Sequence, residues 1–318
     1  MLSRVAERMY WFGRYCERVE NTARLISVYS NLLLDLPLNI KNIWGDLIVI
    51  TGCDDLFFEK FKNSNERNVI KFLLTDKDNP GSLICNINAA RENARTTREI
   101  IPTESWEKIN ELYLYVQKNS QNALKQNARF KIIGEIISYC HQMTGLLFGT
   151  MSHGQAYNFI RIGRNLERAD MTSRILDVGC VNLLQEQENI PDEFDDILWM
   201  NVLRSLSGFQ MYRQHVQDRV NGEDVVNFLL KNQDFPRSVS NCLMVLERCM
   251  ANLPDHDHPL REVTHSQRVI KKMDPPQLIE SGLHEFIDEM QINFAQIHAI
   301  VGQTWFGHEI SQQQEQSA

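Results

Sequence analysis

The sequence predicts an all-α protein, a helical bundle built from a tandem duplication of two similar helical halves. Glycine and proline are scarce, at 15 and 9 of 318 residues, which favours long helices over a turn-rich β fold. Apolar residues recur with helical periodicity in several long segments. One charged motif also occurs twice, at a fixed separation. Together these observations predict the fold class and its internal repeat.

The repeated motif reads G-R-x-x-E-R-x-[ED]-x-T-x-R, and its copies begin at Gly13 and Gly163. The first copy lies in a helix expected over residues 3–34, and the second in a helix expected over residues 161–181. Further landmarks follow in the same order, because the segment 44–52 resembles 199–208 and the segment 71–82 resembles 227–238. Two matching series of landmarks indicate a duplication of about 150 residues rather than a solenoid array.

The predicted boundaries follow from this repeat. The first half covers residues 1–150 and the second covers residues 151–308, and the two halves can pack as one domain. Residues 309–318 are polar and low in complexity, so we expect a disordered tail. The segment 250–275 contains several prolines and acidic residues, which predicts an exposed loop.

In each copy of the motif, one helix face carries an Arg-Glu-Arg trio. Counted from the first arginine, the trio around Glu17 and the trio around Glu167 both have i, i+3, i+4 spacing, so the three side chains project from one helix face. Such a face is either solvated and self-paired, or covered as an internal polar network or an anion site. In the second copy, apolar residues bracket the trio on its own face. Both interpretations stay open at this point.

Other arginines and serines offer weaker candidates. Arg91 and Arg95 belong to an arginine stripe with two possible roles. The stripe either binds a carboxylate or phosphate, or it is exposed to water and pairs with Glu92 and Glu99. Ser82 and Ser238 precede predicted helices, and helix capping explains serines at such positions.

Composition and motifs exclude several functions. The net charge of −8 argues against nucleic-acid binding, and no apolar run approaches the roughly 20 residues of a membrane span. The seven cysteines form no C-x-x-C pair, which fits a reducing cytoplasm. Cys16 and Cys140 occupy apolar helix positions typical of inert packing. The His256-Asp257-His258 run lacks metal-ligand spacing, so no metal site is predicted.

Three segments carry a resemblance to a known family. They read M-L-S-R-V-A-E-R-M-Y-W-F-G-R-Y from Met1, G-R-N-L-E-R-A-D-M-T-S-R-I-L-D-V from Gly163 and F-P-R-S-V from Phe235. Together they resemble the bacterial alpha-E family over residues 1–308. Members of this family are all-helical, and they are gene neighbours and fusion partners of circularly permuted ATP-grasp proteins and transglutaminase-like peptidases. The resemblance therefore implies a role in an amide-bond or peptide-modifying system.

The resemblance also implies which polar positions matter. They are Arg4, Glu7, Arg8, Arg14, Glu17, Arg18, Glu20, Asn21 and Arg24 in the first copy, and Arg164, Glu167, Arg168, Asp170, Thr172, Arg174 and Arg237 in the second half. Family members tend to carry an arginine where this chain has His153. If that arginine holds an anion, this chain binds more weakly or with pH dependence.

Three functions are compatible with the sequence. The chain is expected to be a helical partner subunit of an ATP-grasp ligase, with a peptide or carboxylate substrate. In that case it has no cofactor of its own, and ATP and Mg belong to the partner. Alternatively, the chain itself catalyses an amide-bond or acyl-transfer step with Glu17 or Glu167 as acid and base. A third possibility is a non-catalytic helical scaffold.

Overall fold

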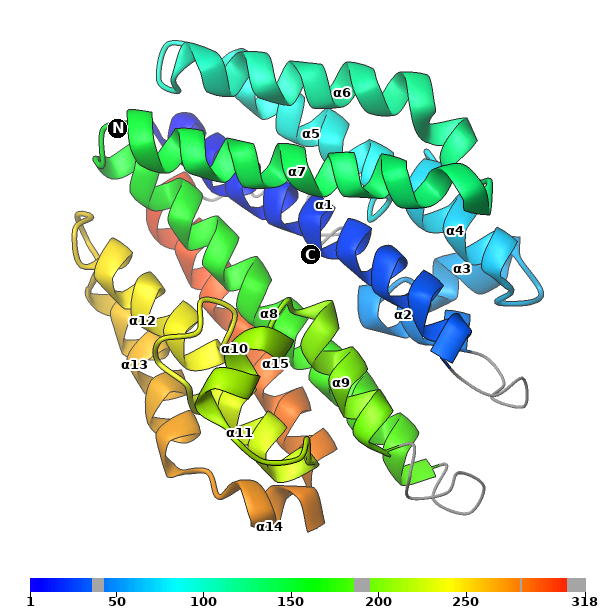
Figure 1. The fold of residues 1–318 in the computed structure, drawn as a ribbon. Helices are drawn as coiled ribbons and strands as arrows, with labels where there is room; N and C mark the ends of the chain where they lie inside the picture. The colour runs from blue at the N-terminus through cyan, green and yellow to red at the C-terminus, as the bar shows by residue number, and fades with distance from the viewer. Residues whose placement is uncertain (36–42, 186–194, 281, 308–318) are drawn as a thin grey trace. The chain divides into compact units, whose positions relative to one another are not determined.

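The computed structural model describes residues 1–35, 43–185, 195–280 and 282–307 of the chain. Over these residues the chain forms α-helices and no strand (Figure 1). The predicted all-α fold class is confirmed. The internal duplication stays a prediction, and the predicted tail over residues 309–318 lies outside the described residues.

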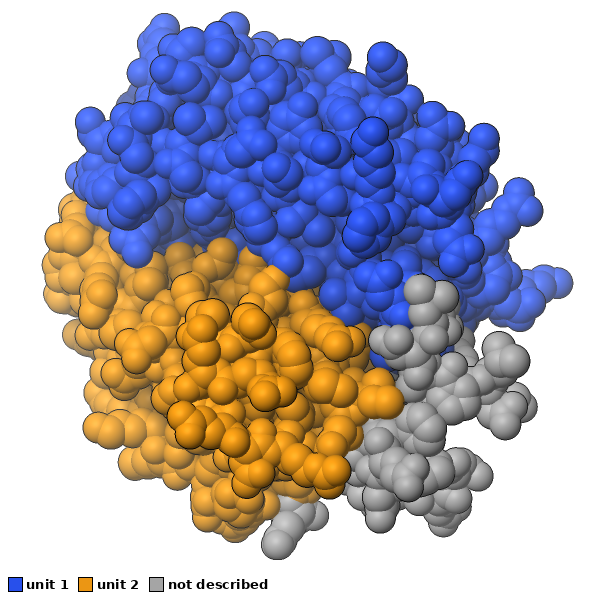
Figure 2. All heavy atoms as spheres, in the orientation of Figure 1, with its two compact units in different colours: residues 1–164, 305–318 blue, residues 165–304 orange. Residues whose placement is uncertain are grey.

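The chain divides into two compact units, coloured separately in Figure 2. Unit 1 contains residues 1–164 together with the segment that begins at Trp305, and unit 2 contains residues 165–304. The boundary falls within a single long helix that carries the second copy of the motif. The predicted division into residues 1–150 and 151–308 stays a prediction of the sequence.

Unit 1 is organised around its first helix. Its helices are α1 (Ser3–Asp35), α2 (Ile43–Thr51), α3 (Asp54–Lys60), α4 (Glu66–Thr75), α5 (Leu83–Thr96), α6 (Thr103–Ala123), α7 (Gln126–Thr150) and the first turns of α8 (Gln155–Gln185). Helix α1 packs against α5 and α7, and α6 packs against the same two helices (Figure 1). The short helices α2 and α4 continue this arrangement, because α2 contacts α1 and α4 contacts α5.

Helix α1 is buried on several sides, which explains why it lies at the centre of unit 1. Met9, Tyr10, Trp11 and Phe12 are consecutive and all have 0% exposure. Four consecutive residues point in different directions around a helix, so no side of α1 at this level faces water. An amphipathic surface helix would show one exposed stripe instead.

Unit 2 contains the rest of α8 and a series of shorter helices. These are α9 (Asp195–Ser205), α10 (Phe209–His215), α11 (Gly222–Lys231), α12 (Val239–Met250), α13 (Asp257–Lys272), α14 (Pro275–Glu280) and α15 (Leu283–Val301). Helix α13 packs against both α12 and α15, and α11 packs against α12 and α14. A π-helical turn, Gly302–Phe306, follows α15.

In each unit, one helix is capped by an asparagine and another by a serine. The Asn65 side chain accepts from the backbone N–H of Asn68 at the start of α4, and Asn221 caps α11 in the same way. Ser82 caps α5 and Ser238 caps α12. Each side-chain oxygen satisfies a backbone N–H that the helix leaves without a partner. The capping roles expected for Ser82 and Ser238 are confirmed.

The prediction of an exposed loop over residues 250–275 is wrong, because α13 occupies Asp257–Lys272. Proline caused the error. Pro259 lies in the first turn of α13, where the missing N–H has no helical partner to lose. The apolar side chains of Val263 and Ile270 then point into the core, with 0% and 2% exposure. A proline in the first turn of a helix is therefore compatible with the helix, and it does not indicate a loop.

Candidate functional site

Helices α1 and α8 touch backbone to backbone at the two motif glycines, both in unit 1. A Cβ atom on Gly13 would collide with the carbonyl oxygen of Ile160, and a Cβ on Gly163 would collide with the carbonyl oxygen of Tyr10. The two contacts are reciprocal, because each glycine meets the residue three positions before the other glycine. Only glycine allows helices to approach this closely. The charged residues that follow each glycine are thereby brought together.

The central ion pair of the site joins the two copies of the motif. The Nε of Arg164 donates to Oε2 of Glu17 at 3.1 Å, and the Glu17 side chain is 0% exposed. The same guanidinium also donates to the Thr144 hydroxyl of α7. A carboxylate without access to water needs such a partner, since an unpaired buried charge is strongly destabilising. Three helices of unit 1 therefore meet at one polar point.

Arg14, the first arginine of the motif, lies against aromatic rings. Its Nη1 is 3.3 Å from the Tyr10 hydroxyl, and its guanidinium carbon lies 5.5 Å from the centre of the Trp11 ring. A guanidinium over an aromatic face is stabilised by the ring quadrupole. Arg14, Glu17 and Arg18 are 4%, 1% and 8% exposed. Of the two interpretations of this face, the covered one describes the structure.

One turn further along α1, Glu20 forms a second polar cluster. Glu20 Oε1 accepts from Arg24 Nη2 at 2.8 Å and lies 3.2 Å from Nε2 of His141 on α7. The Glu20 side chain is 4% exposed, whereas His141 is 59% exposed. Neighbouring Asn21 is 2% exposed. This cluster therefore extends from the buried centre of unit 1 to its surface.

In unit 2, the second copy of the motif holds the turn before α12. Arg168 Nη1 donates to the carbonyl oxygen of Pro236 at 3.3 Å, and the Thr172 hydroxyl donates to the carbonyl oxygen of Arg237 at 2.8 Å. Thr172 is 0% exposed, and Arg237 is 8% exposed. Both donors satisfy backbone carbonyls that helix geometry does not satisfy. The motif thus positions the F-P-R-S turn that starts α12.

The last acidic and basic positions of the motif pair with each other in both copies. Arg174 Nε lies 3.0 Å from Oδ2 of Asp170, as Arg24 lies beside Glu20. Both pairs have i, i+4 spacing, which places them on one helix face. Glu167 is 2% exposed, so the second predicted acid–base residue is as deeply buried as the first.

The arginines of α5 do not join the cluster around Glu17. Arg91 donates to Oδ1 of Asn110 at 2.8 Å, and its guanidinium lies 4.6 Å from the centre of the Tyr113 ring, both on α6. Arg95 pairs with Glu92 at 2.7 Å. Arg91 also pairs with Glu92, at 2.9 Å, so Glu92 is an ion-pair partner of both arginines.

Two cavities of unit 1 lie away from the predicted residues. One, of about 830 Å³, opens between α4, α6 and α7, and the other, of about 200 Å³, opens between α1 and α7. Arg129 lines both, and it pairs with Glu66 at 2.7 Å. Arg129 is 4% exposed, yet no motif surrounds it in the sequence. The polar centre and these cavities are therefore different places.

His153, the position at which the resemblance leads one to expect arginine, contacts a backbone carbonyl and an aromatic ring. Its Nε2 lies 3.0 Å from the carbonyl oxygen of Phe148, and its ring stacks on Tyr157 with centres 4.1 Å apart. The residue is exposed. His153 thus joins the end of α7 to the start of α8.

The two cysteines closest to the polar centre are poor nucleophiles. Desolvation raises the pKa of the Cys16 thiol to about 12. The positive charge of Arg164 lowers this pKa, and the negative charges of Glu17 and Glu20 raise it further. Desolvation likewise raises the pKa of Cys140 well above its ordinary value. Only the thiolate attacks an electrophile. The expectation of inert packing at both positions agrees with these pKa shifts.

The raised pKa of Cys16 predicts that the stability of the protein depends on pH. The folded protein keeps this thiol protonated up to about pH 12, whereas the unfolded chain loses the proton near pH 9. The free energy of unfolding should therefore fall as pH rises from 9 to 12, by up to about 1.4 kcal/mol per pH unit from this group. Urea unfolding at pH 8, 9.5 and 10.5 measures the slope. Cys16→Ala should make the decrease in the free energy of unfolding with pH shallower. An unchanged slope would show that the Cys16 thiol does not cause this decrease.

No helix in the described ranges is both long enough and apolar enough to span a membrane. No solved structure matches the chain. Three uncharacterized mycobacterial proteins match 93% of it. A Mycobacterium bovis protein and a Mycobacterium tuberculosis protein are each 22% identical, and a second Mycobacterium tuberculosis protein is 21% identical. The match covers 35% of each relative, so the chain spans about a third of the length of these proteins.

A family model matches residues 1–306, and it describes a "predicted alpha-helical domain with a conserved ER motif". Glu17-Arg18 and Glu167-Arg168 are Glu-Arg pairs inside the two copies of the repeated motif. Both glutamates lie in the buried polar positions described above. The match covers nearly the whole chain, and the chain therefore belongs to the Alpha-E family.

Proposed function

We propose that this protein is a helical partner subunit of an ATP-grasp ligase system that forms or modifies peptide amide bonds. The observation that carries the proposal is the state of Glu17, which is 0% exposed and held by Arg164. A general acid or base must come within hydrogen-bond distance of the proton that it transfers. A carboxylate buried against a guanidinium is better suited to joining α1 to α8 than to meeting a substrate.

The lengths of the relatives support a partner role. In the three mycobacterial proteins the matching region is about a third of the chain, so the domain works there beside other parts of a longer protein. The resemblance to alpha-E proteins supplies the chemical class, since it links them with ATP-grasp ligases and transglutaminase-like peptidases. In this proposal ATP and Mg bind to the ligase, and the helical subunit supports the ligase or presents its peptide.

Co-purification and turnover test the proposal. The tagged protein is co-expressed with an ATP-grasp protein from the same organism, and ATP consumption is measured with a peptide that has a free carboxylate. We expect the two proteins to elute together and the complex to consume ATP at least about tenfold faster than the ligase alone. Equal turnover by the ligase without this protein would refute the partner role.

A Glu167→Gln variant separates the partner role from catalysis by this chain. If the buried network is structural, the change lowers the melting temperature, and the remaining activity follows the amount of complex. If Glu167 transfers a proton, turnover disappears while the complex and the melting temperature stay intact. That second outcome would replace the proposal with the catalytic alternative.

A further inference from the structure

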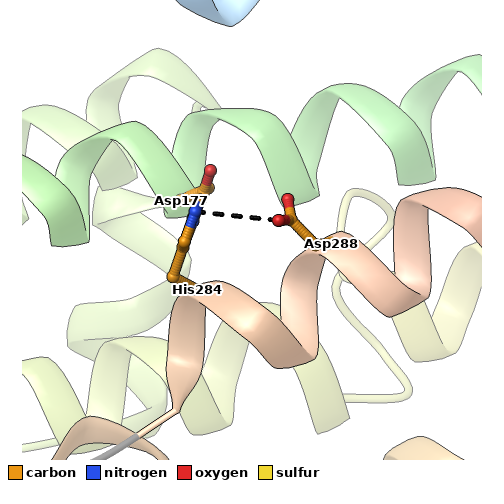
Figure 3. Close-up of side chains that lie close together, drawn as sticks. All are labelled: Asp177, His284 and Asp288. Carbon is orange, nitrogen blue, oxygen red and sulfur yellow. Dashed lines mark hydrogen bonds and ion pairs between the residues drawn. The ribbon is translucent and has the colours of Figure 1, made fainter.

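A His-Asp-Asp cluster lies between α8 and α15 in unit 2, away from the glutamates of the motif. Asp177 projects from α8, and His284 and Asp288 project from the first two turns of α15 (Figure 3). The two residues of α15 have i, i+4 spacing, which places them on one face. One ligand atom from each of the three residues lies within 4.8 Å of the others. A shared cation can reach all three.

The contacts within the cluster bring the imidazole against both carboxylates. His284 Nδ1 lies 2.7 Å from Oδ1 of Asp177, and Nε2 lies 3.7 Å from Oδ2 of Asp288. The Asp177 side chain is 14% exposed, while those of His284 and Asp288 are 51% and 55% exposed. One ligand is therefore held firmly inside the unit, and the other two face water. A cation from solvent has access to the cluster.

The local charge favours a cation. Glu285, on the same turn as His284, adds a third carboxylate close enough to affect Asp177. Two carboxylates therefore contact the imidazole, and a third belongs to the next residue of α15. An additional positive charge relieves their mutual repulsion.

We propose that Asp177, His284 and Asp288 bind a divalent transition-metal ion of the Zn²⁺ class. Imidazole nitrogen and carboxylate oxygen are both ligands of Zn²⁺, at about 2.0–2.2 Å from the metal. In this proposal the two exposed side chains, His284 and Asp288, adjust around Asp177 to reach that distance. The metal takes the place of the proton on one ring nitrogen of His284, and this proton goes to solvent. Water fills the remaining coordination positions.

The other histidine cluster of unit 2 does not offer the same arrangement. His256 Nδ1 lies 2.6 Å from the carbonyl oxygen of Leu253, and Asp257 is 4.0 Å away at the other ring nitrogen. The two residues are neighbours in sequence, and no ligand from another helix completes the set among the described residues. This is the run for which the sequence predicted no metal site.

Binding is tested with untagged full-length protein and Zn²⁺ by isothermal titration calorimetry, with Mg²⁺ as the control metal. We expect one Zn²⁺ per chain and a rise of about 5 °C in melting temperature at saturation. Asp288→Asn should weaken binding by about tenfold or more. Asp288 is half exposed, so this variant keeps its fold even if changes at Asp177 or His284 do not.

Glu285→Gln is the matched control. It removes one negative charge from the same turn of α15 without removing a ligand, so it should weaken binding far less than Asp288→Asn does. Co²⁺ absorption provides a second readout, because a nitrogen and oxygen ligand set lacks the thiolate charge-transfer band that a cysteine site gives. The proposal is overturned if wild-type protein binds no more Zn²⁺ than Asp288→Asn, or if Glu285→Gln weakens binding as much as Asp288→Asn does.

Discussion

Glu17→Ala is expected to lower the free energy of unfolding by about 3–5 kcal/mol, the range measured when one partner of a buried ion pair is removed. The Arg164 guanidinium lies 3.1 Å from a carboxylate that has 0% exposure. Loss of that carboxylate leaves a positive charge with much less compensation in a partly buried position. Urea unfolding followed by circular dichroism at neutral pH measures the difference.

Glu92→Ala is the matched control for this prediction. Glu92 also pairs with arginines, Arg91 and Arg95, but its side chain is 42% exposed. Water screens that pair, so the change should cost less than about 1 kcal/mol. A double variant, Glu17→Leu with Arg164→Met, should recover part of the loss because it removes both charges. Equal effects at Glu17 and Glu92 would contradict a buried role for the motif.

Gly163→Ala should destabilise the protein by about 3 kcal/mol, because an added methyl group must displace a helix backbone. The new Cβ would overlap the carbonyl oxygen of Tyr10 on α1. A backbone carbonyl cannot rotate away as the end of a side chain can. Guanidinium chloride unfolding of the purified variant measures the effect, and Gly13→Ala should behave alike through its contact with Ile160.

Gly145→Ala provides the comparison for the glycine prediction. Gly145 lies within α7, and a Cβ placed there has no neighbour within 4 Å. Alanine in an exposed helical position stabilises by about 0.5–1 kcal/mol relative to glycine. The two substitutions should therefore have opposite signs. A stabilising effect at Gly163 would mean that α1 and α8 do not approach as closely as described.

The helices were predictable because local pattern determines them. The long helix expected over residues 3–34 is α1 (Ser3–Asp35), since a sustained apolar period needs no distant information. Helix α13 was not predicted because proline breaks a helix in its interior but is accepted in the first turn, where Pro259 lies. Position relative to a helix start decides which meaning applies, and composition alone does not give that position.

The candidate site was predictable in its members but not in its pairings. The repeat identified Glu17 and Arg164, yet nothing in the sequence says that each is the partner of the other. That pairing follows from the close crossing of α1 and α8, which depends on the two glycines. Thr144 and His141 were missed, since each is a single polar residue on α7 without a motif. Periodicity shows which face of a helix is polar, and only the packing shows what that face meets.

The separation of Glu17 and Arg164 along the chain has a consequence for biosynthesis. The two residues are 147 positions apart, so the ribosome completes α1 to α7 before the partner of Glu17 exists. Contacts between distant segments form late because closing the chain between them costs entropy. Until α8 is synthesised, Glu17 lacks its ion-pair partner Arg164, and Gly13 lacks the helix that packs against it. Helix α1 is thus synthesised well before it reaches its final surroundings.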